Sequence, residues 1–388
     1  MKNKKNILTF FLSIILSIYL INSYFFVMRI NGKGVNITKF NFYQQLKKTN
    51  NNITLSLYGL SHYFDNGNFF SLSDQSYKKT IHCNENGYFS IFNTDRYGFN
   101  NPDKVWENKE IKFMLVGDSF THGACVNEED TISGNLKKIL FSDEVLNLGY
   151  TANGPLKELA TLKEYLTIKK VERVLWIYTE RNDLYDLANE LNNKILKNYL
   201  TSEDFIQDLK NKQNFIDKNL HNGFKIYLKD EKNRKHNKRF ISFLRLYDLR
   251  NFINSRTLKF KTTPQESKSR NSKETFNKFS EIMNLVSKML NKNGTKLYFI
   301  YLPDFSRYNI KKNQNASFHD YEKVINIINK INIPIIDLNN ELFAKHPEPL
   351  SLFPAKIFGH YRPDHYNELG YKLVTKTIYE RIKEYENK

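Results

Sequence analysis

The chain has 388 residues and a formal net charge of +18, from 59 Lys and Arg against 41 Asp and Glu. This length allows one large α/β domain and a small additional one. The two cysteines cannot build a metal site, and no His/Cys ligand spacing is present, so we expect neither a metal nor a cofactor. Lys and Asn are abundant throughout, so compositional bias explains the charge better than attraction to anionic lipid or acidic polysaccharide. No nucleic-acid-binding motif occurs, which argues against a nucleic-acid partner.

Residues 7–28 form an unbroken uncharged run behind Lys2, Lys4 and Lys5. About 20 apolar residues in a helix span a bilayer core, so the run predicts a transmembrane helix. No small-x-small cleavage pattern follows, which favours an uncleaved anchor over a signal peptide. Basic residues flank both ends, but the N-terminal cluster favours a single-pass protein whose main part lies outside the cytoplasm, on the periplasmic side.

We divide the chain into an anchor (1–30), a stem or small cap (31–110) and an α/β domain (111–388). The cap contains Cys83, and Cys125 lies in the domain. Outside the cytoplasm a single pair of cysteines favours one disulfide, so we expect Cys83 and Cys125 to be joined.

Apolar runs and helical patterns alternate through the domain. The expected strands cover 113–116, 145–148, 174–178, 296–302 and 334–338, and the expected helices cover 131–140, 155–167, 273–290 and 321–330. Strands that alternate with helices imply a parallel sheet covered on both faces. We therefore predict an α/β fold, a flavodoxin-like three-layer sandwich with a parallel five-stranded sheet.

A long polar insertion at about 184–272 interrupts this alternation. Helical patterns occur within it at 184–200 and 240–252. A connection this long is usually functional or independently folded, so a lid or substrate-binding subdomain is expected, with a weakly ordered insertion as the alternative.

Residues 113–123 (Phe-Met-Leu-Val-Gly-Asp-Ser-Phe-Thr-His-Gly) carry the clearest chemical signal. The apolar run predicts a buried strand that leads into a tight turn with Ser119 at its apex. Open α/β sheets bind ligands at the carboxyl ends of their strands, and a nucleophilic hydroxyl suits that place. An ordinary strand-to-helix turn would give the same pattern.

Three further polar blocks follow expected strands or precede the last helix: 147–154 (Asn-Leu-Gly-Tyr-Thr-Ala-Asn-Gly), 179–184 (Thr-Glu-Arg-Asn-Asp-Leu) and 363–371 (Pro-Asp-His-Tyr-Asn-Glu-Leu-Gly-Tyr). With Gly-Asp-Ser at 117–119 they resemble the SGNH (GDSL-type) hydrolase superfamily. Its blocks are Gly-Asp-Ser, a glycine after the second strand, Gly-x-Asn-Asp after the third, and Asp-x-x-His near the C-terminus. The resemblance covers about 110–182 and 295–385, and it implies the same flavodoxin-like architecture and acyl transfer from an ester.

The resemblance implies Ser119 as nucleophile and His365 as base. The oxyanion hole would combine the Ser119 backbone N–H, a backbone N–H at Ala152 or Gly154, and the Asn182 amide. Ala152 stands in the usual glycine place, and we prefer Gly154 because glycine permits the closest backbone approach.

Two positions depart from the family's blocks. Glu180 replaces the glycine of the third block, and Arg362 stands where the family has aspartate. Asp364 is adjacent to His365 instead, and immediate neighbours in an extended chain point opposite ways. Either the turn at Pro363 brings Asp364 to the imidazole, a backbone carbonyl orients the ring, or a dyad suffices.

His122 and His360 are rival bases, but only His365 keeps the motif's spacing to Asn367 and Gly370. We therefore predict a serine esterase or O-acyltransferase at the cell envelope that acts on ester groups, with O-acetylated carbohydrate as the expected substrate. The alternative is a non-catalytic envelope binding or assembly protein, which the missing aspartate supports. A nucleotide-binding loop is disfavoured because residues 117–123 lack the Lys-Ser/Thr of a P-loop. Nothing in the sequence indicates the oligomeric state.

Overall fold

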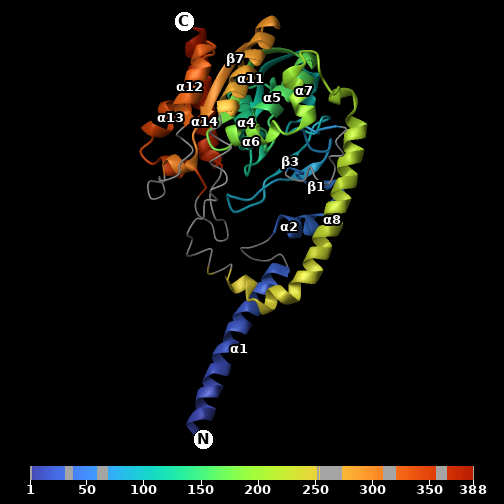
Figure 1. Ribbon diagram of the computed structural model, residues 1–388, viewed down its shortest axis with the longest axis vertical. Coiled ribbons are helices and arrows are strands. Elements are labelled where there is room, and N and C mark those ends of the chain that lie inside the picture. Colours follow the sequence, from blue (N-terminus) through green and yellow to red (C-terminus); the bar gives the residue numbers. More distant parts are fainter. Residues whose placement is uncertain are drawn as a thin grey trace.

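The main domain is built on a five-stranded sheet in which every neighbouring pair is parallel (Figure 1). The computed structural model describes residues 2–30, 38–58, 69–250, 253, 273–308, 320–354 and 365–387. The strands are β4 (Glu110–Gly117), β5 (Val145–Asn147), β6 (Lys170–Thr179), β7 (Lys296–Leu302) and β8 (Ile335–Asp337), in the order β5-β4-β6-β7-β8. This is the flavodoxin-like order. The predicted α/β class and the five predicted strands are confirmed, although β4 and β6 begin earlier than predicted.

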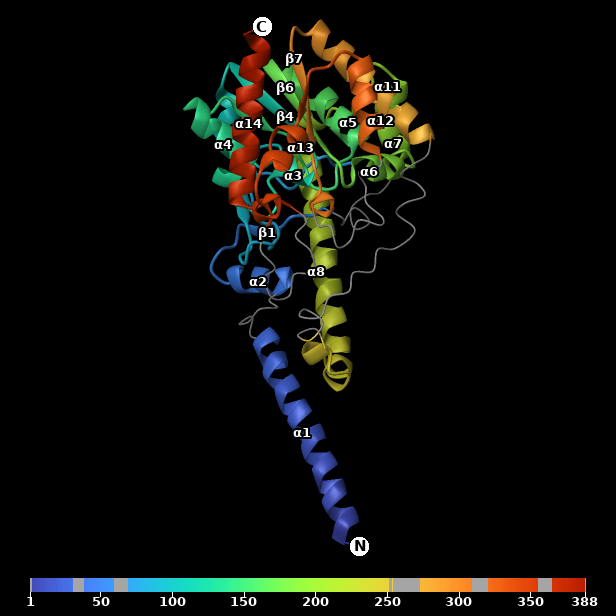
Figure 2. The same ribbon diagram turned by 90° about the vertical axis from the view of Figure 1, so that its left-hand side faces the viewer.

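Both faces of the sheet are buried, which explains the continuous apolar runs of the strands. Successive side chains of β4 point to opposite faces, so Met114 and Val116 join one core while Phe113 and Leu115 join the other. The helices that cover the two faces are α5 (Pro155–Tyr165), α11 (Lys273–Lys292) and α12 (Tyr321–Lys330) on the first, and α4 (Ile132–Leu140) and α14 (Glu368–Glu386) on the second. Figure 2 shows these two helical layers with the sheet between them.

The helices lie close to their predicted positions, with one correction. The stretch predicted to be helical at 184–200 forms two helices, α6 (Asp183–Glu190) and α7 (Lys194–Thr201). The break occurs because the Asn193 side chain accepts the N–H groups of Ile195 and Leu196, at 2.9 and 3.0 Å, and so begins a new helix. Two single-turn helices, α3 (Ser119–His122) and α13 (Leu338–Glu341), follow β4 and β8.

The segment expected to form a stem or small cap contains a second, smaller sheet. Strands β1 (Ile53–Leu55), β2 (Lys79–Ile81) and β3 (Ile91–Asn93) form a three-stranded sheet beside α2 (Lys39–Leu46). The turn after β3 is fixed by the buried Asp95 carboxylate, which accepts hydrogen bonds from the Trp106 indole and the Asn101 amide, both at 2.8 Å. The Asn101 amide also donates to the carbonyl of Asn147 at 2.8 Å, so this turn joins the cap to β5.

A single apolar helix, α1 (Lys2–Ile30), projects from the domain, and its residues Asn6–Val27 are long and apolar enough to cross a membrane. The insertion contributes α8 (Gln213–Leu244), which runs from the domain to α1 (Figures 1 and 2). The sequence pattern missed most of α8 because many of its side chains are polar and exposed, so its apolar periodicity is weak. The predicted helical stretch 240–252 covers the end of α8, a short turn at 245–246 and helical residues 247–250, and residues 251–252 lie outside the described part.

Candidate active site

Ser119 is fixed at the carboxyl edge of the sheet by a helix cap. β4 ends at Gly117, and Asp118 begins α3 by accepting the Phe120 N–H at 2.9 Å. Ser119 is therefore the first residue of a helix, and its own N–H has no acceptor within that helix. The Asp118 carboxylate also accepts the hydroxyl of Thr179, at the end of β6, at 3.0 Å. The two neighbouring strand ends thus hold the serine turn between them.

His365 reaches this serine from the C-terminal segment. Its Nε2 lies 2.8 Å from the Ser119 Oγ. The histidine is held just before α14, whose N-cap Asn367 accepts the Gly370 N–H at 2.8 Å. Asn367 and Gly370, whose spacing from His365 defines the motif, therefore form the cap of α14.

The partner of the imidazole is Glu85, which sequence reasoning missed. Glu85 lies in the loop between β2 and β3, and its Oε1 is 2.9 Å from the His365 Nδ1. Its Oε2 accepts the backbone N–H of His365, also at 2.9 Å. With Glu85 ionised, Nδ1 carries the hydrogen, so Nε2 is free to accept the Ser119 hydroxyl. No motif could indicate Glu85, because the contact joins positions 280 residues apart.

Asp364, the predicted acid, lies outside the described residues, as do Arg362, Pro363 and the rival base His360. The role predicted for Asp364 therefore stays a prediction. In the described part of the chain, it is Glu85 that bonds the imidazole nitrogen that Asp364 was expected to orient.

The Glu85 loop is covalently tied to the serine loop. Cys83 and Cys125 form a disulfide with Cα atoms 4.8 Å apart. Cys83 lies just before Glu85, and Cys125 follows α3. The Asn86 amide reinforces the connection by donating to the Cys125 carbonyl at 3.0 Å.

The possible ligand atoms of Glu85, Cys125 and His365 lie within 4.8 Å of one another, as they would in a metal centre. The sulfur of Cys125 is already bonded to Cys83, and Nδ1 of His365 is bonded to Glu85. This grouping is therefore explained by a hydrogen-bonded triad beside a disulfide.

Gly154 does not offer a free N–H to an oxyanion. Its N–H donates to the buried Glu190 carboxylate at 2.6 Å, and a Cβ at this position would come within 2.8 Å of the Asp186 Cβ. The glycine therefore allows α6 to approach closely, and the predicted oxyanion role of Gly154 is wrong for this conformation.

Ala152, the alternative, has a φ of +64°, in the left-handed region that favours glycine. The described part of the chain gives its N–H no acceptor, whereas its carbonyl accepts Lys157 Nζ at 2.7 Å. The same turn is held against the serine turn by the Tyr150 N–H, which donates to the Gly117 carbonyl at 3.1 Å. Ala152 thus presents an available backbone donor beside Ser119.

Two buried histidines brace this turn through Thr151. His82 Nε2 and His122 Nδ1 each lie 2.9 Å from the Thr151 Oγ1. A hydroxyl has one hydrogen, so it donates to one imidazole and accepts from the other. Burial lowers the pKa of His122 to about 3 and holds the pKa of His82 well below its usual value, so both rings are neutral. Among the described contacts, the rival base His122 thus bonds Thr151, and the imidazole that lies against Ser119 is that of His365.

Asn182 follows β6 as predicted, but carboxylates surround its amide. The amide donates to Asp186 at 2.7 Å. Burial raises the pKa of Asp118, and hydrogen bonds from Phe120, Thr179 and Asn182 lower it. Burial also raises the pKa of Asp186 to about 7.

Two further buried carboxyls, Glu158 and Asp183, lie near Asp118. Burial raises the pKa of each well above its usual value, and the nearby carboxylates add to the rise. Burial and the neighbouring carboxylates therefore both favour the protonated forms of these two groups. A cluster of ionised carboxylates would oppose negative charge near Ser119.

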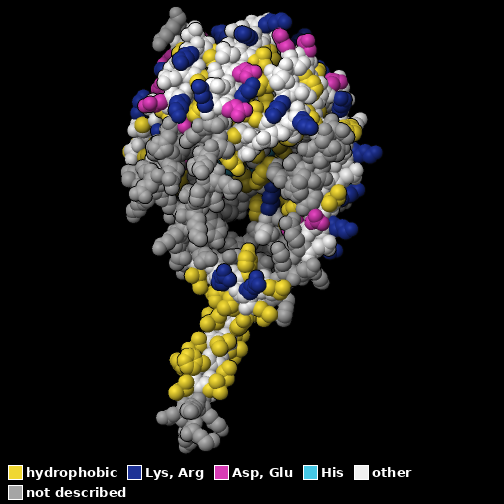
Figure 3. Space-filling view, in the orientation of Figure 1, with side chains coloured by type: hydrophobic (Ala, Val, Ile, Leu, Met, Phe, Trp, Pro, Cys, Tyr) yellow, Lys and Arg dark blue, Asp and Glu magenta, His cyan; other side chains and the backbone are white. Residues whose placement is uncertain are grey.

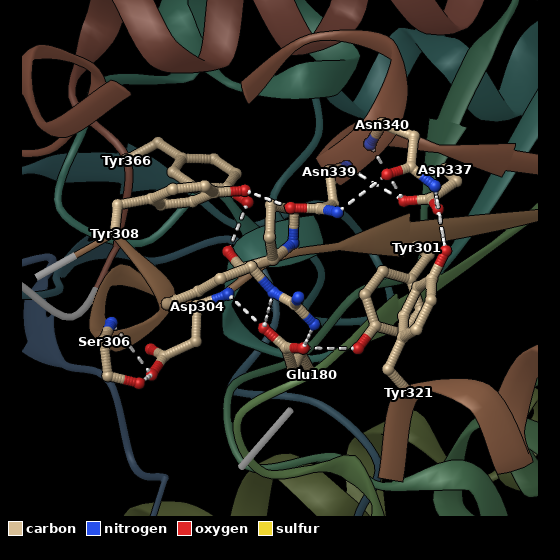
Figure 4. Close-up of polar contacts among 12 residues, drawn as sticks. Glu180, Tyr301, Asp304, Ser306, Tyr308, Tyr321, Asp337, Asn339, Asn340 and Tyr366 are labelled. Carbon is tan, nitrogen blue, oxygen red and sulfur yellow. Dashed lines mark hydrogen bonds and ion pairs between the residues drawn. The ribbon is translucent and has the colours of Figure 1, made fainter. Parts of the chain in front are cut away.

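Glu180, which stands in the family's glycine position, has structural partners (Figure 4). Its buried carboxylate accepts the Tyr301 hydroxyl at 2.7 Å and the Asp304 N–H at 3.0 Å. It also pairs with the Arg307 guanidinium. Glu180 thus ties β6 to the end of β7, which accounts for this departure from the family's pattern.

Several solved structures resemble the chain distantly. A lipolytic protein of the G-D-S-L family from Desulfitobacterium hafniense DCB-2 aligns with a TM-score of 0.35 and 12% identity, over 70% of this chain and 99% of that one. A lipase/acylhydrolase from Enterococcus faecalis aligns with a TM-score of 0.36 and 14% identity, over 70% and 96%. A two-domain esterase active on acetylated mannans aligns with a TM-score of 0.37 and 12% identity, over 74% and 52%. No family model and no curated protein matches the chain.

Proposed function

We propose that this chain is a membrane-anchored serine esterase or O-acyltransferase of the SGNH (GDSL) type. One observation carries the proposal: a continuous hydrogen-bonded path runs from Glu85 through His365 to the Ser119 hydroxyl, with 2.9 Å at Nδ1 and 2.8 Å at Nε2. Acyl transfer from an ester requires an orienting acid, a base and a nucleophile in this order.

In the first step the Ser119 Oγ attacks the ester carbonyl carbon while His365 Nε2 takes the hydroxyl proton. The carbonyl electron pair moves onto oxygen, and Glu85 stabilises the imidazolium. When the carbonyl re-forms, the bond to the alcohol oxygen breaks, and the alcohol leaves with the proton from His365. Water or an acceptor hydroxyl then attacks the acyl-serine by the same steps and releases Ser119.

The oxyanion would be stabilised by the backbone N–H groups of Ser119 and Ala152. The left-handed backbone of Ala152 costs about 1 kcal/mol, and the bracing of Thr151 between two neutral histidines offsets it. Asn182 joins as a third donor if its amide turns one N–H from Asp118 to the substrate oxygen.

We place the active domain outside the cytoplasm and propose an O-acetyl group on envelope carbohydrate as the substrate. The support is the basic N-terminus before an apolar helix and the disulfide beside the site, since disulfides persist in oxidising compartments. The esterase and the O-acyltransferase reactions differ in the acceptor of the acyl group. Transfer to water releases acetate, whereas transfer to a sugar hydroxyl forms a new acetyl ester.

The test is labelling of the full-length protein with a fluorophosphonate serine probe. Wild type should be labelled at Ser119, while Ser119→Ala and His365→Ala should not react. His221→Ala, which alters an exposed histidine of α8, is the matched control and should be labelled like wild type. A folded wild-type protein that remains unlabelled would contradict the enzyme and support a binding or assembly module.

A further inference from the structure

The far end of α8 is fastened to the outer turns of α1. The Tyr19 hydroxyl donates to the Leu244 carbonyl at 3.0 Å, and the Asn22 amide donates to the Phe243 carbonyl at 3.2 Å. The Asn22 Oδ1 accepts the Leu249 N–H at 3.2 Å. Asn22 is fully buried although it belongs to the apolar stretch of α1. These contacts satisfy carbonyl groups at the end of α8 that have no partner within that helix.

Ring packing places the end of α8 and the residues after it along the last turns of the apolar stretch. We call residues 241–250 the tip of α8, although the helix itself ends at Leu244. The Phe243 ring lies 5.8 Å from the ring of Tyr19 and 5.3 Å from that of Phe26. At 1.5 Å per residue, positions 19–27 occupy about the last 12 Å of the stretch. In a bilayer whose apolar core is about 30 Å thick, this part of α1 runs from about 10 Å inside the core to the boundary between acyl chains and headgroups.

The tip also carries hydrophobic and basic side chains that α1 leaves uncovered: Ile241 (50% exposed), Leu244 (49%), Tyr247 (48%), Arg245 and Arg250. The single acidic residue of the tip, Asp248, is buried. Just before the tip, residues 232–239 contain five Lys and Arg and no acidic residue. Figure 3 shows the hydrophobic surface of α1 widening where α1 meets the end of α8, with Lys or Arg side chains among it.

We infer that the tip of α8 is a second membrane contact, seated in the headgroup and acyl-chain boundary of the bilayer that α1 crosses. The inference rests on the anchoring part of the proposed function. The occupant is a lipid surface with anionic headgroups, because exposed apolar side chains flanked by basic ones are typical of interfacial helices. Acyl chains cannot hydrogen-bond to backbone, and the carbonyls of Phe243 and Leu244 at the end of α8 already accept hydrogen bonds from Asn22 and Tyr19.

This second contact deepens the proposed function, because α8 then acts as a strut. The helix has 32 residues and is about 48 Å long, and its other end packs into the core through Ile216, Leu220 and Phe224. A helix fixed at both ends holds the domain at a set distance from the membrane. This suits an ester on a polymer that extends from the surface better than the acyl chain of a membrane lipid.

The experiment uses full-length protein in vesicles of phosphatidylcholine and phosphatidylglycerol. A cysteine is introduced at Leu244→Cys, at Leu16→Cys in α1 (62% exposed) or at Ile226→Cys, farther back on α8 (52% exposed), and carries an environment-sensitive fluorophore. The native cysteines are joined, so they do not take up the label without reductant. Doxyl-labelled lipids should quench the probes at 244 and 16 about twofold or more and leave the probe at 226 unchanged.

Quenching at 16 without quenching at 244 would overturn the second contact and leave the anchor intact. No quenching at 16 would overturn the anchor itself. A blue-shifted probe at 244 that lipid does not quench would mean that protein covers the tip. Equal quenching at 226 would mean that α8 lies along the bilayer and is not a strut.

Discussion

At the residue scale, the carboxylate that lies 2.9 Å from Nδ1 of His365 belongs to Glu85, in the loop between β2 and β3. The proposed function makes it the acid that orients the base. Replacing the carboxylate in Glu85→Gln should lower kcat by about 10²–10⁴ with little change in KM, because an amide does not stabilise the imidazolium. Hydrolysis of p-nitrophenyl acetate measures this, with Asp364→Asn as the matched variant. Asp364→Asn should stay near wild type, and an equally severe loss would return the role to Asp364.

Asn182 tests the third donor of the oxyanion hole. Asn182→Ala should lower kcat by about 10²–10³ with KM nearly unchanged, as expected for a donor used in the transition state. A loss confined to KM would make Asn182 a substrate contact, and wild-type kinetics would leave the two backbone N–H groups as the complete hole.

The two buried histidines that contact Thr151, His82 and His122, make the stability of the folded protein depend on pH. His122 has a pKa of about 3 in the folded protein, below the usual value near 6.5, so the unfolded chain binds a proton that the native protein does not. Stability should therefore fall as pH drops below about 6.5, by about 2 kcal/mol between pH 6.5 and 5.

Urea unfolding of wild type and His122→Gln across this range measures the effect. Buried Asp95 contributes the opposite slope, because its pKa is raised to about 6 and its stabilising effect is lost as pH rises. Asp95 contributes equally in both proteins, so the difference between their unfolding free energies removes its effect. If the two curves of unfolding free energy against pH are parallel, the assignment to His122 is wrong.

At the scale of elements, the disulfide connects the loop that carries Glu85 to the loop that follows Ser119. The bridged cysteines are 42 positions apart, so the double variant Cys83→Ser, Cys125→Ser should lose about 3–4 kcal/mol of unfolding free energy in the chain-entropy model. It should also lose kcat beyond what partial unfolding explains, because Glu85 is no longer held against His365. Thermal melts and initial rates measured well below the melting temperature separate the two effects. An unchanged kcat would show that hydrogen bonds alone hold the loop.

At the scale of the whole molecule, the two ends of the chain lie at opposite ends of the structure (Figure 1). A reporter fused after α14 should therefore fold without disturbing α1. If the N-terminus is cytoplasmic, C-terminal alkaline phosphatase should be active and C-terminal green fluorescent protein dark. The reverse result would place the domain in the cytoplasm and remove the basis for the envelope substrate.

The sequence by itself determined the α/β fold with its parallel sheet and the apolar N-terminal helix, and it selected Ser119 and His365, which the structure places 2.8 Å apart. The strands are apolar runs that need no tertiary context to be recognised, and the predicted bounds of α12 match the observed ones. The motif spacing that selected His365 reflects a local helix cap at Asn367, and local geometry can be read from neighbouring residues.

Only the tertiary structure showed the contact of Glu85 with His365, the acceptor of the Gly154 N–H and the position of α8. Glu85 contacts His365 although the two residues are 280 positions apart in the chain. The backbone N–H of Gly154 already donates to the carboxylate of Glu190 in α6. The end of α8 meets α1 more than two hundred positions away. Such contacts form where the fold brings distant segments of the chain together. The spacing of neighbouring residues does not predict them, because side-chain periodicity indicates only which face of a helix or strand is buried.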